Sequence, residues 1–594
     1  MGETWIYWSD SVVLYSTMCF GLLAILGAMA VWPAIIRKTS WHGDALYIFT
    51  LCGFVFAARW PGLFYPRGFN PDEDQLVAAA RALVLDPVFF RAAEAGSSGP
   101  LNVYPLLSSL AFGAWPTLFS ARLVGLAMIC LAVVAVYFLG RALFSESVAR
   151  FGALMPAAFF GLTNFWDFTH YTSEHVPMAL LAVGWALSAW AVFRGEMPFR
   201  WRVVLACLAA GVFSIVPFAK LQASMAAVGA SAVLVIGVFA YGRTWRERFS
   251  GAGIVCAAGV FVPAGLVGFF AINGALEYFW LSYIQNALAY QEAGNRDHSA
   301  MQILGMILFA KPPMRPDDFL WFGGGWVAIV GLSVIALVLA RHRSAPWRSW
   351  GGIAYAVALL GLAVWTVTTP QRNYPHYLLF LPVAMGVVAM ALIGVLDGKI
   401  SAWRPVLRPV AIGLFFLLGV GPVVFARLQS PDSWAGLAKK WATEKPSPIS
   451  QKILEASGGE GRLCVWGYNP TYYSETGMLQ ATRLSTSGGL IGNHPLRSMF
   501  LATYLDDLRK NQPSVFVDAV APEQFVIMTK REDHGHEAVP EVREFVVANY
   551  DLFAEIEGVR VYRWKNQPNS GESSDRDKEF PVGLNQSLQT EKAE

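Results

Sequence analysis

Long apolar runs constrain this chain more than any other feature of its sequence. A helix that crosses a bilayer needs about 20 mostly apolar residues. Only 15% of the 594 residues are charged, whereas average globular domains carry about a quarter. We therefore predict a polytopic α-helical membrane protein with about twelve transmembrane helices. The twelve runs that reach or approach the required length lie near residues 11–36, 45–62, 120–141, 148–166, 176–193, 203–219, 222–241, 251–271, 319–340, 350–369, 376–396 and 408–427.

The lysines and arginines of the short loops lie mostly on one side of the predicted membrane. Six loops on that side contain sixteen of them, whereas the short opposite loops contribute only Lys220 and Arg372. Short cytoplasmic loops are enriched in these residues. The pattern predicts an inner (plasma) membrane protein with both termini extracytoplasmic. The formal net charge of +3 is too small for a nucleic-acid-binding surface.

The predicted outer face carries most of the polar length of the chain. A membrane module over 1–427 has two large outer loops, 63–119 and 272–318. Residues 428–564 are predicted to form a small extracytoplasmic α/β domain, and 565–594 to be a disordered tail. Within the domain we expect strands at Arg462–Trp466, Val515–Asp518 and Arg560–Trp564 and helices at Ser498–Arg509 and Val539–Tyr550. His534 and His536 are predicted to be surface residues, because no cysteine completes a metal motif around them.

Three consecutive carboxylates, Asp72, Glu73 and Asp74, open the first outer loop. They follow Asn70 and Pro71, and acids at the start of a helix are favourable without doing any chemistry. Three of them exceed what a helix cap needs, and their mutual repulsion should raise at least one pKa. The three acids could therefore simply cap the helix, or they could belong to an active site. In an active site, one of them would act as a general base or bind a divalent cation such as Mg²⁺ or Mn²⁺.

A second polar stretch lies between two spans on the same face. Asp167, His170, Glu174 and His175 fall within nine residues, just before Pro177. Polar groups at the start of a helix can simply cap it, and a histidine there is more often structural. Nevertheless, Glu174 could share a cation or a substrate hydroxyl with Asp72, and His170 or His175 could do the same. Asp72 and Glu174 are the predicted metal ligands.

The third group is cationic. Lys220, Arg372 and His376 lie at the outer ends of spans, and Lys311 and Arg315 lie in the second outer loop. An isolated cation at the edge of a bilayer usually extends toward the headgroups. Several cations close to an acid-lined site instead suit a phosphate at the membrane surface.

Several motifs, in this order and on this face, resemble the GT-C superfamily of integral-membrane glycosyltransferases, in particular bacterial relatives of protein O-mannosyltransferases and aminoarabinose transferases. The resemblance covers most of residues 45–490. The motifs are NPDEDQLVAAARALV (70–84), VYPLLSSL (103–110, one proline short of the family pattern), SARLVGLAMICLAVVAVYFLGRALF (120–144), YTSEHVPMALL (171–181), FAKLQ (218–222), NYPHYLLFLP (373–382) and VWGYNPTYYSETG (465–477).

The resemblance implies a transferase that takes a sugar from a polyprenyl-phosphate-linked donor at the outer face of the membrane. Asp72 matches the acid that acts as base or holds a metal, with Glu73 beside it, and Glu174 matches the second acidic position. Lys220, Arg372 and His376 would hold the donor phosphate by the same resemblance. Apart from the resemblance, we also predict Tyr104 and Lys311 to be substrate-binding residues. The acceptor, whether a lipid, a glycan or a protein, stays open. One base with direct displacement predicts inversion of the sugar's anomeric carbon.

Two other classes of protein fit a chain with twelve spans. A secondary transporter places its charged sites near the middle of the membrane, whereas these acids gather at one face. A non-catalytic scaffold of envelope-glycan assembly would need none of them. The enzymatic interpretation requires Asp72, Glu174 and Lys220 to converge.

Overall fold

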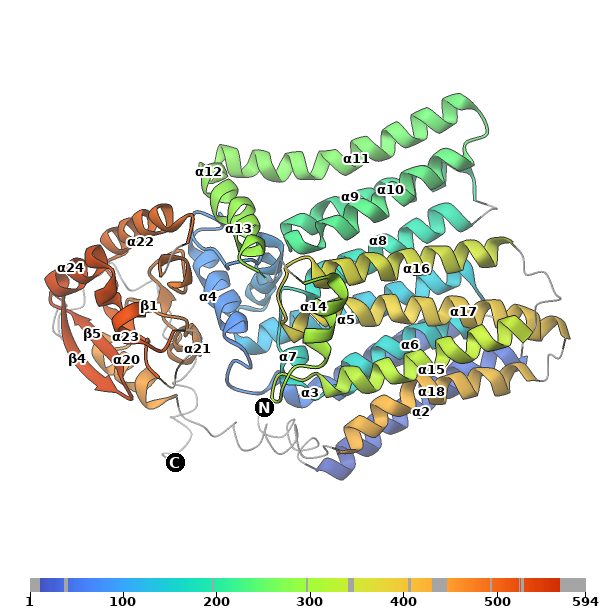
Figure 1. Cartoon of the computed structure of the whole chain (residues 1–594), viewed down its shortest axis with the longest axis horizontal. Helices are drawn as coiled ribbons and strands as arrows, with labels where there is room; N and C mark the ends of the chain where they lie inside the picture. The colour runs from blue at the N-terminus through green and yellow to red at the C-terminus, as the bar shows by residue number, and fades with distance from the viewer. Residues whose placement is uncertain are drawn as a thin grey trace.

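The computed structural model describes residues 11–36, 41–194, 197–294, 298–339, 347–403, 407–429, 446–491, 494–522, 524 and 528–566. Eleven of the helices described there are long and apolar enough to cross a membrane, and together with the shorter α6 they form one bundle (Figure 1). This arrangement confirms the predicted polytopic architecture. The bundle comprises α2 (Val12–Ile36), α3 (Trp41–Leu63), α5 (Leu118–Leu143), α6 (Glu146–Leu162), α8 (His175–Phe193), α9 (Phe199–Ile215), α10 (Ser224–Tyr241), α11 (Trp245–Ile272), α15 (Asp317–Leu339), α16 (Trp347–Thr368), α17 (Leu381–Trp403) and α18 (Arg408–Gln429).

Helix α6 is the centre of the bundle. It corresponds to the predicted span at 148–166, has only 17 residues, and every one of them is buried. It packs against α2, α3, α5, α17 and α18. By contrast, α11 exposes large apolar side chains such as Val260 and Phe261, as expected for a helix whose neighbours are lipid chains. A helix enclosed by protein on all sides can be shorter than the hydrocarbon layer, because no lipid needs to be matched along its length.

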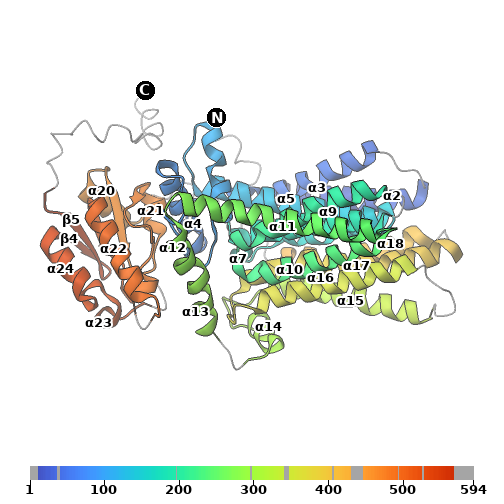
Figure 2. The same ribbon diagram turned by 90° about the horizontal axis from the view of Figure 1, so that it is seen from above.

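The two outer loops and several short helices gather at one end of the bundle (Figure 2). These elements connect the bundle to the C-terminal part of the chain and carry the polar residues discussed below. They are α4 (Pro71–Leu85), η1 (Pro100–Asn102), η2 (Tyr104–Phe112), α7 (Trp166–Thr169), η3 (Val216–Phe218), η4 (Leu221–Ala223), α12 (Leu276–Tyr278), the π-helix η5 (Phe279–Gln285), α13 (Asn286–Glu292), α14 (Ala300–Leu308) and η6 (Pro375–Phe380).

A five-stranded sheet of order β2-β1-β3-β5-β4 forms the C-terminal part. Strands β2, β1 and β3 are parallel, whereas β5 runs antiparallel to β3 and β4. Buried apolar strands flanked by helices on both faces are typical of parallel sheets. The elements are α20 (Pro448–Ser457), β1 (Arg462–Trp466), α21 (Thr471–Thr476), β2 (Leu479–Gln480), η8 (Gly488–Leu490), α22 (Arg497–Asn511), β3 (Val515–Asp518), α23 (Arg531–His534), η9 (His536–Ala538), α24 (Pro540–Asn549), β4 (Tyr550–Ile556) and β5 (Val559–Trp564).

The predicted strands at 462–466 and 515–518 have the bounds of β1 and β3, whereas the hairpin of β4 and β5 was only half predicted. The predicted helix ran to Tyr550, but that residue begins β4. A two-residue turn, Glu557 and Gly558, then reverses the chain with positive φ at both positions, which is the favoured geometry for a tight hairpin. Apart from its first two residues, the tail predicted over 565–594 lies outside the described residues.

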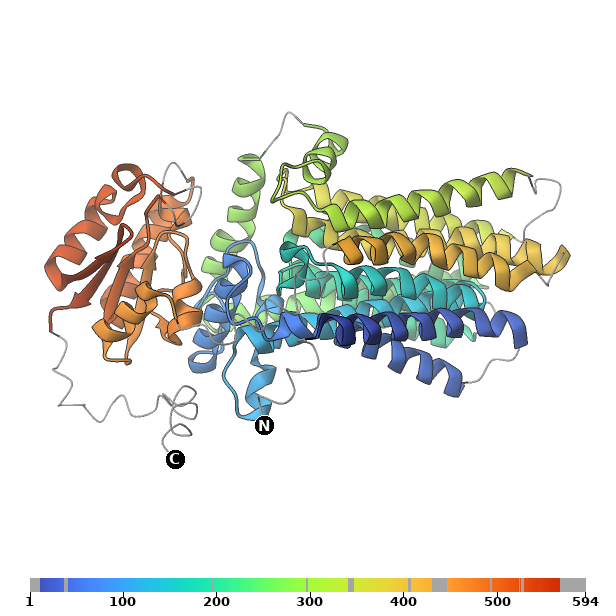
Figure 3. The ribbon, with the colours of Figure 1, turned by 90° about the horizontal axis from the view of Figure 1, so that it is seen from below.

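Helix α4 lies between the bundle and the sheet (Figure 3). Leu76 and Leu83 pack in a cluster with side chains of the two outer loops. On another face of α4, Ala78 packs in the core of the C-terminal part, with Ile453 and Val465. The two parts of the molecule thus share this helix, and its first turn is the place where both can contribute to one site.

Candidate active site

Asn70 and Pro71 fix where α4 begins. The Asn70 side-chain oxygen accepts the backbone N–H of Asp72 at 3.0 Å, and Pro71 occupies the first helical position. Both residues are favoured there, because asparagine satisfies a free N–H and proline has none to satisfy. Asn70 rather than Asp72 is therefore the cap, and all three acids lie in the first helical turn. The three then point to different partners.

Asp72 reaches the C-terminal part of the protein. Its Oδ1 accepts a hydrogen bond of 2.6 Å from the Tyr468 hydroxyl, at the carboxyl end of β1. Its side chain is half-buried, and no contact to Oδ2 is found in the described part of the chain. Asp72 thus keeps one oxygen oriented by a phenol and one oxygen available.

Glu73 is enclosed and fully paired. Its two oxygens accept Nε and Nη2 of Arg122 at 2.9 and 2.7 Å, and Oε1 also accepts the backbone N–H of Tyr171 at 2.9 Å. The side chains of Glu73 and Arg122 are 0% and 1% exposed. A bidentate pair of this kind fixes geometry, and leaves Glu73 no free oxygen for a substrate.

Asp74 is buried without a cation. Thr471 donates to its Oδ2 at 2.9 Å, while Oδ1 is buried and has no partner in the described part of the chain. Burial, together with the nearby charge of Glu73, raises the pKa of Asp74 to about 7. The sequence prediction that crowding raises a pKa in this cluster therefore applies to Asp74, although burial contributes more than repulsion.

The second acidic stretch provides Asp167 and Glu174, each bound to a cation from a distant segment. Asp167 Oδ2 accepts the backbone N–H of His376 at 2.9 Å and lies 3.0 Å from its Nδ1, while Oδ1 accepts Asn70 at 3.0 Å. Burial opposes ionisation of this carboxyl, but the charge and hydrogen bond of His376 outweigh it and lower the pKa of Asp167. Asp167 therefore ties the cap of α4 to the start of η6.

Glu174 is 0% exposed, and its Oε1 lies 2.8 Å from Nζ of Lys220. The ammonium also donates to Ser173 and lies 5.6 Å from the centre of the Tyr377 ring. Burial would raise the pKa of Glu174, but the charges of Lys220 and His376 outweigh it and lower that pKa. The predicted meeting of Glu174 with Lys220 is thus present as a buried ion pair.

Arg372 belongs to the same network through Tyr290 of α13. Its guanidinium lies 4.4 Å from the centre of the Tyr290 ring and donates to the Tyr290 carbonyl at 3.0 Å. Burial, the phenol of Tyr374 and the charge of Asp72 raise the pKa of Tyr290. Tyr290 therefore holds the guanidinium of Arg372 within range of the charge of Asp72.

The structure does not bring two of the predicted substrate-binding residues to this cluster. The Tyr104 hydroxyl donates to the Pro87 carbonyl at 2.9 Å, at the far end of α4. Lys311 is exposed, and Arg315 pairs with its neighbour Asp317 at 2.6 Å. Both loop cations carry the features of ordinary surface residues.

Sequence reasoning did not single out Tyr468, Tyr290 or Arg122 as members of the site. Tyr468 stands in the motif VWGYNPTYYSETG, but nothing in that motif indicates a partner 396 residues earlier in the chain. Tyr290 and Arg122 stand in apolar or amphipathic surroundings, where a single polar side chain carries no recognisable pattern.

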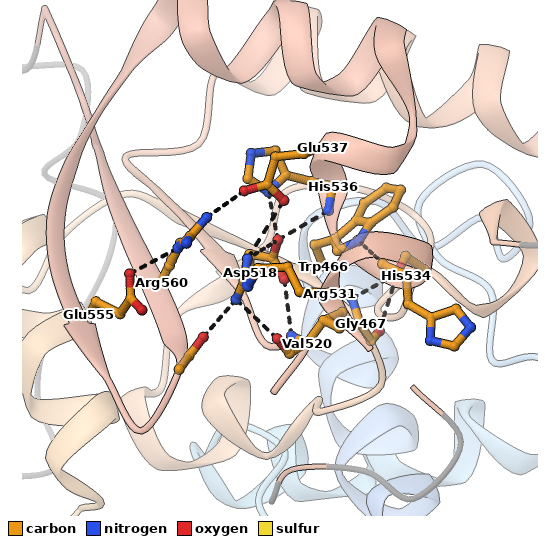
Figure 4. Close-up of polar contacts among 12 residues, drawn as sticks. Trp466, Gly467, Asp518, Val520, Arg531, His534, His536, Glu537, Glu555 and Arg560 are labelled. Atoms are coloured by element: carbon orange, nitrogen blue, oxygen red, sulfur yellow. Dashed lines mark hydrogen bonds and ion pairs between the residues drawn. The ribbon is translucent and has the colours of Figure 1, made fainter. Parts of the chain in front are cut away.

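A metal ion shared by Asp72 and Glu174 stays a prediction. The Lys220 ammonium pairs with Oε1 of Glu174 at 2.8 Å, and like charges repel, so this ion pair disfavours a cation at that oxygen. Among the described residues, one group of three side chains has donor atoms close enough for a metal ion: Asp518, His536 and Glu537. There, Arg531 and Arg560 already hold the carboxylates, with contacts of 2.9 Å to Asp518 and 2.6 Å to Glu537 (Figure 4).

The same group corrects the prediction that His536 is a surface residue. His536 is 2% exposed, and its Nδ1 lies 2.6 Å from Oδ2 of Asp518. Its backbone N–H donates to the same oxygen at 3.1 Å (Figure 4). The half-buried His534 accepts the Trp466 indole N–H on its carbonyl at 2.8 Å. Both histidines therefore fasten the segment before α24 to the ends of β1 and β3.

The bundle and the C-terminal sheet together form a GT-C-like fold, as the motifs predicted. The solved structure of ArnT from Cupriavidus metallidurans bound to undecaprenyl phosphate aligns with a TM-score of 0.52 and 12% sequence identity, over 88% of this chain and 98% of that chain. Its apo form aligns with the same TM-score and identity over 87% and 98%.

The Archaeoglobus fulgidus oligosaccharyltransferase tethered with an acceptor peptide aligns with a TM-score of 0.42 and 11% identity, over 85% of this chain and 70% of that chain. No protein-family model matches this sequence, and no curated protein matches it either. The similarity to ArnT therefore establishes the fold.

Proposed function

We propose that this protein is a glycosyltransferase that transfers a sugar from a polyprenyl-phosphate-linked donor to an acceptor hydroxyl, at the extracytoplasmic face of the membrane and with inversion. The observation that carries the proposal is the network at the head of α4. In it, Asn70 binds both the backbone of Asp72, whose side chain keeps an available oxygen, and the carboxylate of Asp167, which is paired with His376. The cations Lys220 and Arg372 are held at the same end of the GT-C-like bundle. ArnT, with the same fold, was solved with undecaprenyl phosphate.

In this reaction Asp72 is the base. The acceptor oxygen attacks the anomeric carbon and forms the new C–O bond, while its proton passes to the Asp72 carboxylate. The bond from the anomeric carbon to the phosphate oxygen breaks, and its electron pair leaves with the polyprenyl phosphate. A positioned base contributes about 10²–10⁴-fold to such a step. Because attack and departure occur on opposite faces in one displacement, the anomeric configuration inverts.

The cations stabilise the leaving phosphate. Negative charge develops there as the bond breaks, and donors fixed beforehand stabilise it more in the transition state than in the ground state. Lys220 is held by Glu174 and Ser173, and Arg372 is held over the Tyr290 ring, so neither cation has to be ordered during the reaction. We assign the same role, stabilisation of the leaving phosphate, to His376, which is bound to Asp167.

The remaining acids of the cluster have supporting roles in this proposal. Glu73, predicted from the sequence to be catalytic, fixes the first turn of α4 through Arg122. Glu174 positions Lys220 and does not act as a metal ligand, so no step in the mechanism uses a cation bound there. Tyr104 and Lys311 are left outside the proposed site, because their described contacts lie elsewhere.

A cavity beside α4 supports a lipid substrate. It has a volume of about 310 Å³ and lies where α3 ends and α5 begins. Its walls include Phe64 and Phe119, whose ring centres are 5.1 Å apart, and the guanidinium of Arg81. Apolar and aromatic walls at the boundary of the bundle suit an alkyl chain.

We also propose the orientation that the loop charges predicted, with the head of α4 outside the cytoplasm and both chain ends on that side. Reporter fusions test it: alkaline phosphatase joined after residue 594 should be active, and the same reporter joined after Arg243 should not. An active reporter at Arg243 would contradict the orientation and, with it, an extracytoplasmic reaction.

The test of the function compares Asp72→Asn with Asp86→Asn, which changes another half-buried acid, directly after the last turn of the same helix. Mass spectrometry of envelope glycolipids and glycoproteins should find a sugar-bearing species with wild type and Asp86→Asn and not with Asp72→Asn, at equal protein level in the membrane. An unchanged product with Asp72→Asn would refute the assignment of the base. NMR of the isolated product against its donor measures the anomeric configuration, and retention would refute single displacement.

A further inference from the structure

A small polar cavity inside the bundle lies apart from the proposed reaction. Its volume is about 20 Å³, and it lies among α3, α5 and the segment around α7 and the start of α8. Its polar walls are Arg59, Arg122, Thr163, Thr169, His170 and His175. A cavity of roughly 10–15 Å³ is enough for one water, so the space admits one or two small species and no phosphate or sugar.

Arg59 is a buried cation without a counter-charge. It is 8% exposed and lies near the end of α3. Its Nη2 donates to the Phe168 carbonyl at 2.8 Å, whereas its Nη1 is buried and has no hydrogen-bond partner. Within the residues that the structure describes, no carboxylate lies at ion-pair distance from Arg59. The carboxylate of Glu73 is nearby, but it is paired with Arg122. An unpaired charge inside a protein is strongly destabilising.

His175 presents a second free donor to the same cavity. It is 1% exposed. Its Nδ1 lies 3.1 Å from the backbone nitrogen of Thr172, which can only donate, and 3.4 Å from the Thr172 carbonyl oxygen, which can only accept. Because the contact with the donor is the shorter one, we assign Nδ1 as the acceptor and the ring proton to Nε2. That Nε2 is buried and has no partner in the described part of the chain.

Both unpaired groups are thus donors, one of them positively charged, and they meet at a space of about the size of one ion. We propose that the cavity binds a small monovalent inorganic anion, with chloride as the probe. The ion accepts from Nη1 of Arg59 and from Nε2 of His175 and neutralises the guanidinium. It thereby joins α3 to the segment that carries Asp167 and Glu174.

The first test is thermal unfolding of the purified full-length protein in detergent at constant ionic strength, with chloride replaced stepwise by gluconate, an anion too large for the cavity. Because a ligand of the native state stabilises it by mass action, Tm should rise by about 1–1.5 °C between about 10 and 300 mM chloride. Bromide should act as chloride does. A Tm that is the same in chloride and gluconate would overturn the proposal.

The variant Arg59→Met should abolish the halide dependence of Tm. The matched control is Arg91→Gln, which removes a cation from the exposed ion pair with Asp86 and should keep the full dependence. Equal halide dependence in wild type and Arg59→Met would place the anion elsewhere and refute the site. Should Arg59→Met fail to fold, bromide-soaked crystals of wild type decide: anomalous density between Arg59 and His175 supports the proposal, and water alone in that cavity refutes it.

Discussion

The ion pair of Lys220 and Glu174 allows stability and catalysis to be separated in one set of variants. Both side chains are enclosed, at 5% and 0% exposure, and the charged atoms lie 2.8 Å apart. Removing one partner of such a pair leaves a buried charge and costs about 3–5 kcal/mol. The entropy of unfolding grows with chain length, so for a chain of this size the loss corresponds to a fall in Tm of about 2–4 °C.

Lys220→Met and Glu174→Gln should each show that fall, whereas the double variant should return to within about 1 °C of wild type, because no unpaired charge is left. Activity should behave differently. If Lys220 stabilises the leaving phosphate, its loss should lower sugar transfer by about 10²–10³-fold, and the double variant should stay at that low level. The assays are differential scanning fluorimetry in detergent and turnover measured by mass spectrometry of the product.

Two results would refute this reasoning. Recovery of activity together with stability in the double variant would show that Lys220 is a structural residue only. A fall in Tm that is no smaller in the double variant than in the single variants would show that the two charges do not compensate each other.

The stability of the protein should also depend on pH through this ion pair. Because Lys220 lowers the pKa of Glu174 below its usual 4.5, the contribution of the ion pair to stability should persist at pH 5 and be lost as the pH falls through the lowered pKa.

Three further predictions follow from the cluster at α4. The pKa of Asp74 is about 7 in the folded protein against a usual 3.8, so its carboxyl contributes less to stability as the pH rises from 4 to 7. Asp74→Asn should therefore be more stable than wild type at pH 8, by roughly 4 kcal/mol at most. A gain in Tm that does not shrink toward pH 4 would contradict this. Arg122→Met should lose about 3–5 kcal/mol by leaving Glu73 unpaired, and adding Glu73→Gln should recover it; a single-variant loss below about 1 kcal/mol in a denaturant titration would argue against a buried pair. Tyr468→Phe should lower kcat about tenfold with the donor KM unchanged, because the base loses a charged hydrogen bond, whereas Tyr472→Phe should not; a change in KM alone would contradict the positioning role.

Much of the fold follows from local sequence because its signals are short-ranged. The length of each apolar run shows whether it can cross a membrane. The buried strands β1 and β3 are short, mostly apolar runs. The hairpin of β4 and β5 was only half predicted because the helical pattern of α24 continues smoothly into Tyr550. What ends that helix is pairing with β5, a contact that no local pattern displays.

The candidate site, too, was predictable only in part from local sequence. Asp72, Glu174 and Lys220 were identifiable because charges are rare beside apolar spans. The partners of Asp72 and Glu73 were not identifiable: Tyr468 is 396 residues from Asp72, and Arg122 is 49 residues from Glu73. Sequence patterns could therefore identify the ionised groups but not decide between Glu73, which is enclosed by a guanidinium, and Asp72, which keeps an available oxygen.

The contact between Tyr468 and Asp72 has a consequence for the synthesis of this protein. The acid is made early, in the first outer loop, and its phenolic partner follows 396 residues later. The bundle helices all precede that tyrosine in the chain, so they can be inserted in the lipid while the acid still lacks its partner. If the proposed function holds, a nascent or truncated chain that stops short of β1 is thus expected to transfer sugar at least about tenfold more slowly than the full chain, because Asp72 then lacks the hydroxyl that orients it.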